Sequence, residues 1–286
     1  MTGRPDRRRN AAEAIFADEI GLQFGVYGEF RLWSAYQPIF APRGRTLRAV
    51  AVEALIEPRR AAGPVAPPVF FDGVPASDRL FVETMCRMLH LGNYRNIGVD
   101  GLTLFFNYNP KINDHRGRAL AEIRLMTRHL GDFGLEPAML VCEITEQAAD
   151  EHLLASLVRE MRRDGVRIAI DDFGTGHSTE ARMGLLLPDI IKIDGGWFAE
   201  FCRHAAAERF FRPLVSMLHD RGAKVLVEGI EHATHLRVAL DGGVDLLQGY
   251  HLARPALAGT IFNEEPLSID ALLGTDNKVV PLHQRR

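Results

Sequence analysis

Several short apolar runs of this chain end in polar or acidic residues, which are types that could hold a divalent metal ion. The runs are AVAVEAL, LFFNYN, LVCEITE, RIAIDDFG, DIIKID, KVLVEGIE and LLQGY. A strand buried on both faces of a parallel sheet reads as a continuous apolar run, so a polar residue at its downstream end lies where a parallel barrel opens to solvent. The side chains gathered at such a mouth would be Glu53, Asn107, Glu143, Asp171, Asp172, Lys192, Glu228 and Gln248.

Five of these side chains are carboxylates, and their convergence predicts a metal site. Carboxylates in one cleft repel one another, and bound cations make an ionised cluster tolerable. A single acid near a strand end is more often a helix cap or an ion-pair partner. Asp171 and Asp172 weaken that plainer interpretation, because consecutive strand residues point to opposite faces and both reach the mouth only where the strand ends.

Length and composition favour one globular domain. The chain has 286 residues, of which 47% are hydrophobic and 25% charged, and a single barrel commonly needs ~250 residues. The formal net charge of −3 provides no basic field, so extended nucleic acid is not an expected partner. A small phosphorylated ligand, neutralised locally by metal, fits this charge.

Cysteine usage and hydropathy predict a cytoplasmic protein without membrane insertion. Cys86, Cys142 and Cys202 are an odd number with wide spacing and no CxxC pair, which argues against a disulfide framework and a zinc cluster. Acidic residues from Glu13 to Glu19 interrupt what would be the apolar core of a signal peptide. No stretch approaches the ~20 apolar residues of a spanning helix.

The start of the chain differs in pattern from the rest. Residues 1–29 are expected to form an N-terminal extension that is helical, because their apolar residues scatter over a helical face with acids between them. From Phe30 onwards, FRLWSAYQPIF and RAVAVEALI read as two strands that the turn PRGR joins into a hairpin. The Pro-rich and Gly-rich segment 57–77 is then expected to be a surface loop.

Beyond this loop, helices alternate with the strands. Helical periodicity or position predicts them over residues 77–91, 116–130, 151–163, 179–187, 203–221 and 233–240. Alternating strands and helices imply a parallel sheet, and six such units imply closure into a barrel. The expected domain covers residues 30–268, and residues 269–286 form a C-terminal tail.

Eight motifs, all in one order, carry a family resemblance. They are QPIF at 37–40, EAL at 53–55, FNYN at 106–109, CEITE at 142–146, DDFGTG at 171–176, KID at 192–194, EGIE at 228–231 and QGY at 248–250. In this order the chain resembles the EAL-domain cyclic-di-GMP phosphodiesterases over roughly residues 30–266. The resemblance implies an α/β fold, a (β/α)8 TIM-type barrel with one antiparallel strand near the start, namely the second strand element. It also implies hydrolysis of cyclic di-GMP to linear pGpG.

Carried over position by position, the resemblance implies two metal sites. Glu53, Asn107, Glu143 and Asp171 would hold one ion, and Asp172, Glu228 and a shared Asp171 would hold the second. All donors are oxygen atoms, which favours Mg²⁺ or Mn²⁺ over zinc.

The resemblance also implies the remaining roles around these ions. Glu228 is the expected general base, with Lys192 beside the attacking water and Glu53 counted among the catalytic residues. Glu146 corresponds to a family position that braces the loop after Asp172, and Glu231 to one that orients Lys192, the water or the metal ligands. The expected substrate contacts are Gln37, Leu55 and Gln248. Residues around 179–187 resemble the family's usual dimer surface, so a homodimer is expected.

One position departs from the family pattern. Where the family has an arginine downstream of the EAL triplet, this chain has Glu57, followed by Pro58. A carboxylate beside an anionic ligand is unfavourable unless it turns away, and Arg43, Arg59 or Arg60 could reach over in compensation. This substitution keeps open a cyclic-di-GMP receptor without turnover that signals through a partner. A barrel phosphohydrolase acting on another nucleotide also stays open, because it needs the same metals and differs only in the pocket.

Overall fold

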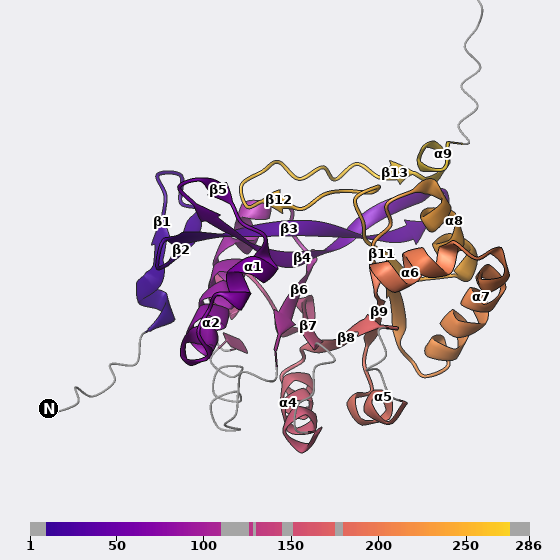
Figure 1. The fold of residues 1–286 in the computed structure, drawn as a ribbon, viewed down its shortest axis with the longest axis horizontal. Helices are drawn as coiled ribbons and strands as arrows, with labels where there is room; N and C mark the ends of the chain where they lie inside the picture. Colours follow the sequence, from indigo (N-terminus) through magenta and orange to yellow (C-terminus); the bar gives the residue numbers. More distant parts are fainter. Residues whose placement is uncertain (1–9, 110–125, 128–129, 145–150, 175–179, 275–286) are drawn as a thin grey trace, which may run out of the picture.

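The protein forms an eight-stranded barrel with helices around it (Figure 1). The structure is a computed structural model that describes residues 10–109, 126–127, 130–144, 151–174 and 180–274. The barrel strands follow one another around the ring in the order β3, β11, β10, β9, β8, β7, β6 and β4, and pairing of β3 with β4 closes it. Their bounds are β3 Phe30–Arg43, β4 Thr46–Arg60, β6 Thr103–Tyr108, β7 Leu140–Ile144, β8 Arg167–Phe173, β9 Ile190–Ile193, β10 Lys224–Val227 and β11 Leu246–Leu247.

Seven of these strands run parallel, and β3 opposes them. The pairs from β4 through β6, β7, β8, β9 and β10 to β11 are all parallel, whereas β3 is antiparallel to both β4 and β11. The predicted hairpin is therefore confirmed, but its first strand is the antiparallel one, not the second. The reason is that β4 enters the parallel series by pairing Glu53 with Phe105, which leaves β3 to close the ring.

Helices cover the outside of the barrel and match most of the predicted positions. Those found where the sequence predicts them are α2 Ala76–Asn93, α4 Glu151–Arg163, α5 Glu180–Leu186, α7 Ala205–His219 and α8 Ala233–Gly242. An additional helix, α6 Gly195–Cys202, begins where the Asp194 side chain accepts a hydrogen bond from Trp197 N. The helix predicted over 116–130 falls almost entirely outside the described residues. Short 3-10 helices lie at η1 Ala11–Ala14, η2 Tyr94–Ile97, η4 Leu130–Phe133 and η5 Pro137–Met139.

The prediction of a helical N-terminal extension is wrong for the described part of that segment. After η1, the chain forms β1 Ile15–Ala17 and β2 Gln23–Tyr27, an antiparallel pair that extends the sheet beyond β3. Asp18 reverses the chain between them, because its Oδ1 accepts hydrogen bonds from Ile20 N and Leu22 N. The free edge of β3 supplies a partner strand, and this pairing outweighs the weak helical pattern.

The predicted loop over 57–77 also contains more structure than expected. It begins within β4, forms β5 Gly63–Pro64 on that strand, and continues into α1 Pro67–Asp72. Phe70 anchors α1 because its ring is 1% exposed and packs edge-on against Phe30 and Tyr27. Prolines at the first helical turn do not interrupt the helix, since those N–H groups have no partner within it.

The chain returns to the β3–β4 hairpin at its C-terminal end. β12 Ala256–Leu257 pairs with β3, and β13 Leu267–Ser268 pairs with β4. The helix α9 Ile269–Leu272 follows, with Asp270 bonded to Arg45, so regular structure continues past the expected boundary at residue 268. None of the helices among the described residues is long and apolar enough to cross a membrane.

Candidate active site

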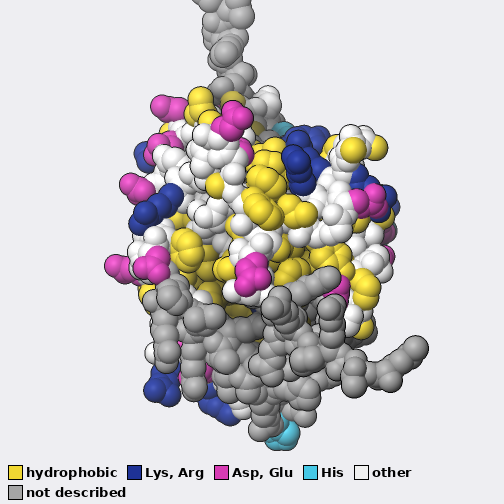
Figure 2. Space-filling model, turned by 90° about the vertical axis from the view of Figure 1, so that its left-hand side faces the viewer, with side chains coloured by type: hydrophobic (Ala, Val, Ile, Leu, Met, Phe, Trp, Pro, Cys, Tyr) yellow, Lys and Arg dark blue, Asp and Glu magenta, His cyan; other side chains and the backbone are white. Residues whose placement is uncertain are grey.

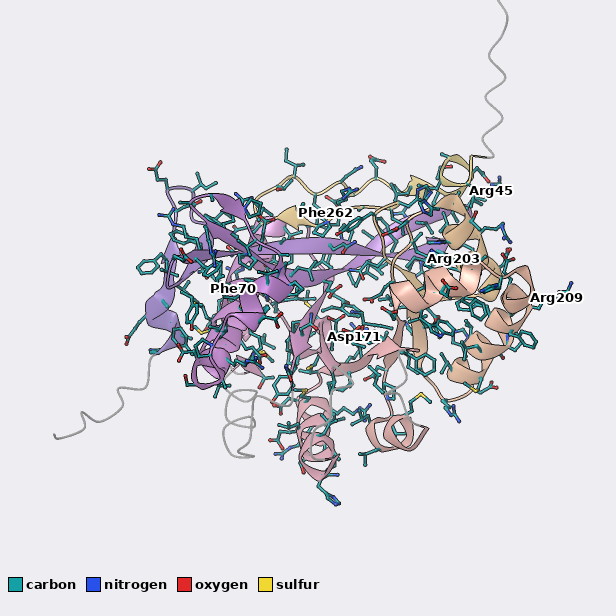
Figure 3. All side chains as sticks on the ribbon, in the orientation of Figure 1. Arg45, Phe70, Asp171, Arg203, Arg209 and Phe262 are labelled. Carbon is teal, nitrogen blue, oxygen red and sulfur yellow. The ribbon has the colours of Figure 1, made fainter. Side chains whose placement is uncertain are left out.

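The strand ends at one mouth of the barrel bring the predicted polar side chains together. β4, β6 and β7 carry Glu53, Asn107 and Glu143, and β8 carries the two aspartates. The register aligns Asn107 with Glu143, one strand apart. Figure 3 shows Asp171 on β8, in the interior of the molecule. The remaining members stand on β9 or directly after β10 and β11: Lys192, Glu228 and Gln248.

Lys192 lies at the centre of this cluster and contacts four carboxylates. Its ammonium Nζ is 2.6 Å from Glu143 Oε1, 2.7 Å from Glu228 Oε1, 3.1 Å from Asp171 Oδ1 and 3.7 Å from Glu53 Oε1. The lysine is 1% exposed and Glu143 is fully buried. Sequence reasoning placed Lys192 beside an attacking water and missed this role, because a strand pattern gives no information on where a long side chain ends.

Amide groups hold Glu53 from two sides. Gln248 Nε2 donates to Glu53 Oε2 at 2.8 Å, and Asn107 Nδ2 lies 3.5 Å from Glu53 Oε1. Glu53 and Gln248 are 8% and 3% exposed, so these contacts are shielded from water. Since amides donate here to the carboxylate, their carbonyl oxygens remain directed elsewhere and could serve as neutral ligands.

A β-bulge explains how two consecutive aspartates reach one mouth. Ile170 pairs with Ile191, but Phe173 pairs with Ile193, so Asp171 and Asp172 on β8 stand where β9 has one residue. Asp172 takes φ of 59°, a left-handed conformation that Asp tolerates better than most residues. The strand therefore does not have to end at the aspartates for both to reach the mouth. A local bulge turns both side chains toward the cleft instead.

The geometry groups three of the acids as one candidate metal cluster. One oxygen each from Asp171, Asp172 and Glu228 lies within 4.8 Å of the other two. Within the described part of the chain, this is the group of acids, histidines and cysteines that meets the geometry of a metal site. These are the residues expected to share the second ion.

Burial and like charge shift the proton affinities of the cluster. Burial raises the pKa of Glu143 well above its usual range and that of Glu228 to about 8, and neighbouring carboxylates add to both effects. Burial and Asp171 likewise raise the pKa of Asp172. Burial alone would lower the pKa of Lys192, but the surrounding carboxylates outweigh it and hold that pKa well above its ordinary value.

The donor set fits a hard divalent cation. Glu143 Oε2 is buried and accepts no hydrogen bond from any described residue, and Asp171 Oδ1 has only its ionic contact with Lys192. A buried carboxylate oxygen without a donor is costly unless a cation approaches it. Oxygen donors without histidine or cysteine suit Mg²⁺ or Mn²⁺.

Glycines allow the loops that carry Glu228 and Gln248 to pack closely. A Cβ on Gly229 would stand 2.7 Å from the Gly195 Cα, and a Cβ on Gly249 would stand 2.2 Å from Ile230 N. Both contacts are with backbone, which cannot move aside as a side chain can. After Glu228 and after Gln248, a glycine thus follows directly at the point where two backbone segments cross closely.

The other predicted site residues lie at different distances from the cluster. Gln37 pairs with Glu53 across the hairpin and donates to Ala253 O at 3.2 Å, and half-buried Leu55 lies on the same face of β4 as Glu53. Glu231 is exposed, and no hydrogen bond or ion pair joins its carboxylate to the cluster among the described residues. Glu146 lies outside the described residues.

Glu57 lies on the Glu53 face of β4 and is paired within its own strand. Arg59 Nε lies 2.5 Å from Glu57 Oε1, and the two side chains are 43% and 32% exposed. Trp33 lies directly opposite Glu57 on β3. Sequence reasoning missed Trp33, although the alternation of the two strands would place it on the mouth-facing side.

Comparison with known proteins gives a consistent result. The family model for the EAL domain matches residues 28–255. The probable cyclic di-GMP phosphodiesterase PdeD of Escherichia coli (strain K12) is 27% identical over 245 residues, which cover 84% of this chain and 44% of PdeD.

Two solved structures share the fold. The Bacillus subtilis YkuI protein, in complex with cyclic di-GMP and calcium, gives a TM-score of 0.70 at 25% identity, covering 82% of this chain and 57% of YkuI. Klebsiella pneumoniae BlrP1, in a complex with manganese and cyclic di-GMP, gives 0.68 at 25% identity, covering 79% and 56%. The chain therefore spans about half the length of these proteins.

Proposed function

The chain belongs to the EAL-domain family, and on that premise we propose that it hydrolyses cyclic di-GMP to linear pGpG in a metal-dependent reaction. The observation that carries the proposal is the single mouth at which Glu53, Glu143, Asp171 and Glu228 surround Lys192. Relatives named for this activity or solved with this ligand support the choice of substrate.

Two Mg²⁺ or Mn²⁺ ions fit the oxygen donors of this site. Glu53, Asn107, Glu143 and Asp171 would hold one, and Asp172 and Glu228 would hold the other together with Asp171. Bound there, the ions would neutralise charge on the phosphoryl group and activate a water molecule.

The protein's own residues then divide the remaining work. Glu228 is the proposed general base, because its carboxylate lies at the mouth within the acidic cluster that would hold the second ion, where a water molecule would be activated. Lys192 provides a fixed positive charge 2.7 Å from that carboxylate, which favours negative charge developing nearby. Gln37 and Leu55 are the proposed substrate contacts at the rim, and Gln248 orients Glu53.

Product analysis tests this function directly. The purified chain, stripped with chelator and reloaded with Mn²⁺, should convert cyclic di-GMP to pGpG, and excess chelator should abolish turnover. Asp171→Asn provides an inactive control, since it removes a charge shared by both proposed ion sites. Full turnover in excess chelator contradicts the metal proposal. Binding of cyclic di-GMP without any product favours the receptor function, which Glu57 in place of the family arginine keeps open.

We also propose that the protein acts as a cytoplasmic homodimer. Leu185 and Leu187, at the end of α5, are 40% and 64% exposed, which supports an apolar contact surface there. Three free cysteines are compatible with a reducing compartment. Sedimentation velocity of wild type and Leu185→Glu at micromolar concentration tests the dimer, and a monomeric wild type contradicts it.

A further inference from the structure

The β3–β4 hairpin extends beyond the barrel mouth and presents the same face as the active site. Residues directly opposite in an antiparallel pair share a face, and alternate residues along each strand share it too. The inward face that carries Glu53 and Gln37 therefore continues outward through three further pairs: Leu55 with Ala35, Glu57 with Trp33, and Arg59 with Arg31. The opposite face packs on α1 and α2 through Leu32 and Ile56.

A row of aromatic rings crosses this extension. Phe16, Phe24 and Trp33 stand opposite one another on β1, β2 and β3. Phe24 stacks on Trp33 at 5.0 Å between ring centroids and 26° between planes, and Phe16 follows at 6.0 Å and 30°. The half-buried indole of Trp33 stacks on Phe24 with the face that lies toward β2. Its other face lies on the side of β4, where Glu57 follows in the same row.

This end of the molecule is unusually apolar at its surface. Figure 2 shows hydrophobic side chains gathered in the middle of the face that carries β1, β2 and α1, with charged side chains around them. The exposed hydrophobic residues here include Phe16 at 50%, Ile20 at 79% and Val26 at 36%. The aromatic row is therefore accessible from solvent at its outer end.

The carboxylate of Glu57 is held in place without being satisfied. Arg59 engages Oε1 at 2.5 Å, and no described residue donates to Oε2. An ion pair within one strand fixes the direction of the carboxylate. Glu57 therefore presents an oriented acceptor edge next to the indole face that does not stack on Phe24.

The spacing from the metal ligands suits a nucleotide. Glu53 pairs with Phe105 on β6, so Asn107, two residues further along β6, lies at the level of Leu55. Glu57 stands two residues beyond Leu55 on β4, about 7 Å further along the strand. A phosphate at the carboxylate cluster would leave its base at the height of Trp33 and Glu57.

We infer that Trp33 and Glu57 form a guanine subsite, in which the indole stacks on the base and the carboxylate accepts hydrogen bonds from guanine N1–H and N2–H. The inference rests on the proposed function for the identity of the substrate. Stacking on an aromatic ring accepts any base. The carboxylate adds selectivity, because adenine has an acceptor at N1 and no amino group at C2. Arg59 is a positioning residue that orients Glu57.

This assignment reverses the expectation from charge alone. If Glu57 faced the phosphates, Glu57→Arg would strengthen binding by replacing repulsion with attraction. If Glu57 reads guanine, the same substitution removes the acceptors and places donors against donors, so binding weakens. The two possibilities therefore predict opposite signs for one variant.

Binding measurements in Ca²⁺ with full-length protein test the subsite. In a Trp197→Phe background, Trp33 is the single tryptophan of the chain, so its fluorescence reports stacking at this position. Cyclic di-GMP should quench it. Glu57→Gln and Glu57→Arg should each weaken cyclic di-GMP binding about tenfold or more, whereas Glu57→Gln should leave cyclic di-AMP binding within about twofold. Arg59→Gln should produce a smaller loss of the same selectivity.

A matched control exists at the same end of the hairpin. Glu29 pairs with Arg60 at 3.1 Å, as Glu57 pairs with Arg59, but Arg60 lies on the opposite face of β4. Glu29→Gln should therefore leave cyclic di-GMP binding unchanged, and thermal melts confirm that each variant is folded. Unquenched Trp33 fluorescence, an unchanged affinity in Glu57→Gln or a gain in Glu57→Arg each overturns the subsite.

Turnover assays separate this inference from the proposed function. Hydrolysis of cyclic di-GMP together with binding that ignores Glu57 overturns the subsite and leaves the phosphodiesterase intact. Guanine-selective binding without product supports the subsite and contradicts the phosphodiesterase function.

Discussion

At the scale of single residues, Glu228 is the most direct link between geometry and rate. Glu228→Gln keeps the shape and removes the charge, so kcat should fall about 10²–10⁴-fold while substrate affinity changes little. Steady-state kinetics with saturating Mn²⁺ measures this split. Glu136→Gln, an exposed acid preceding β7 at the far end of the barrel, is the matched control. A Glu228→Gln enzyme within a few-fold of wild type refutes the role.

Lys192 gives a second prediction at the same scale, this time for stability. Lys192→Met leaves buried Glu143 without its cation, and breaking a buried ion pair typically costs about 3–5 kcal/mol. In chelator, the variant should melt well below wild type. Mn²⁺ should then raise the melting temperature of the variant by more than it raises that of wild type. Arg237→Met removes exposed pairs and should change the melting temperature little. Equal melting of Lys192→Met and wild type without metal would rule out this role.

At the scale of strands and loops, the tight crossing after Gln248 is the most demanding element. Gly249→Ala places a Cβ against the backbone of Ile230, and such overpacking typically costs about 1–3 kcal/mol. The shift should also weaken the Gln248–Glu53 hydrogen bond and hence Mn²⁺ affinity. Calorimetric melts and Mn²⁺ titration measure both effects. Gly131→Ala is the control, because an added Cβ there meets nothing within 4 Å. A variant as stable as wild type contradicts the packing argument.

The same scale shows where sequence patterns succeed and where they stop. Apolar runs that end in acids predicted the mouth residues, because strands buried on both faces have an unmistakable composition and parallel strand ends must meet. The bulge at Asp171 and Asp172 was not predictable, since it depends on pairing with β9. β1 and β2 were missed for a similar reason: a strand of three to five residues has too short a pattern, and its partner supplies the rest.

At the scale of the whole molecule, the cluster makes stability depend on pH. Glu143, Asp172 and Glu228 have raised pKa values, so their protonated forms are favoured in the folded protein. Their contribution is present below the ordinary carboxyl pKa near 4.5 and is lost as pH rises through about 8 for Glu228. Metal-free protein should therefore melt at lower temperature at pH 8 than at pH 5.5.

Bound metal should cancel this loss, because it favours the ionised carboxylates. The increase in melting temperature caused by Mg²⁺ should then be larger at pH 8 than at pH 6, and binding near pH 7 should release protons. Melting curves at both pH values, with chelator and with Mg²⁺, measure the difference. A metal-free protein that gains stability between pH 5.5 and 8 contradicts the sign.

Lys192 also bears on the life of the protein in the cell. Because its ammonium already neutralises part of the acidic cluster, the chain is expected to fold after synthesis without the proposed manganese or magnesium. Under metal starvation the protein would accumulate as an intact, silent reserve instead of being degraded. Restored metal would then switch on this reserve within the time of ion binding, without new translation. Separate signals would thus control the abundance of the protein and its activity.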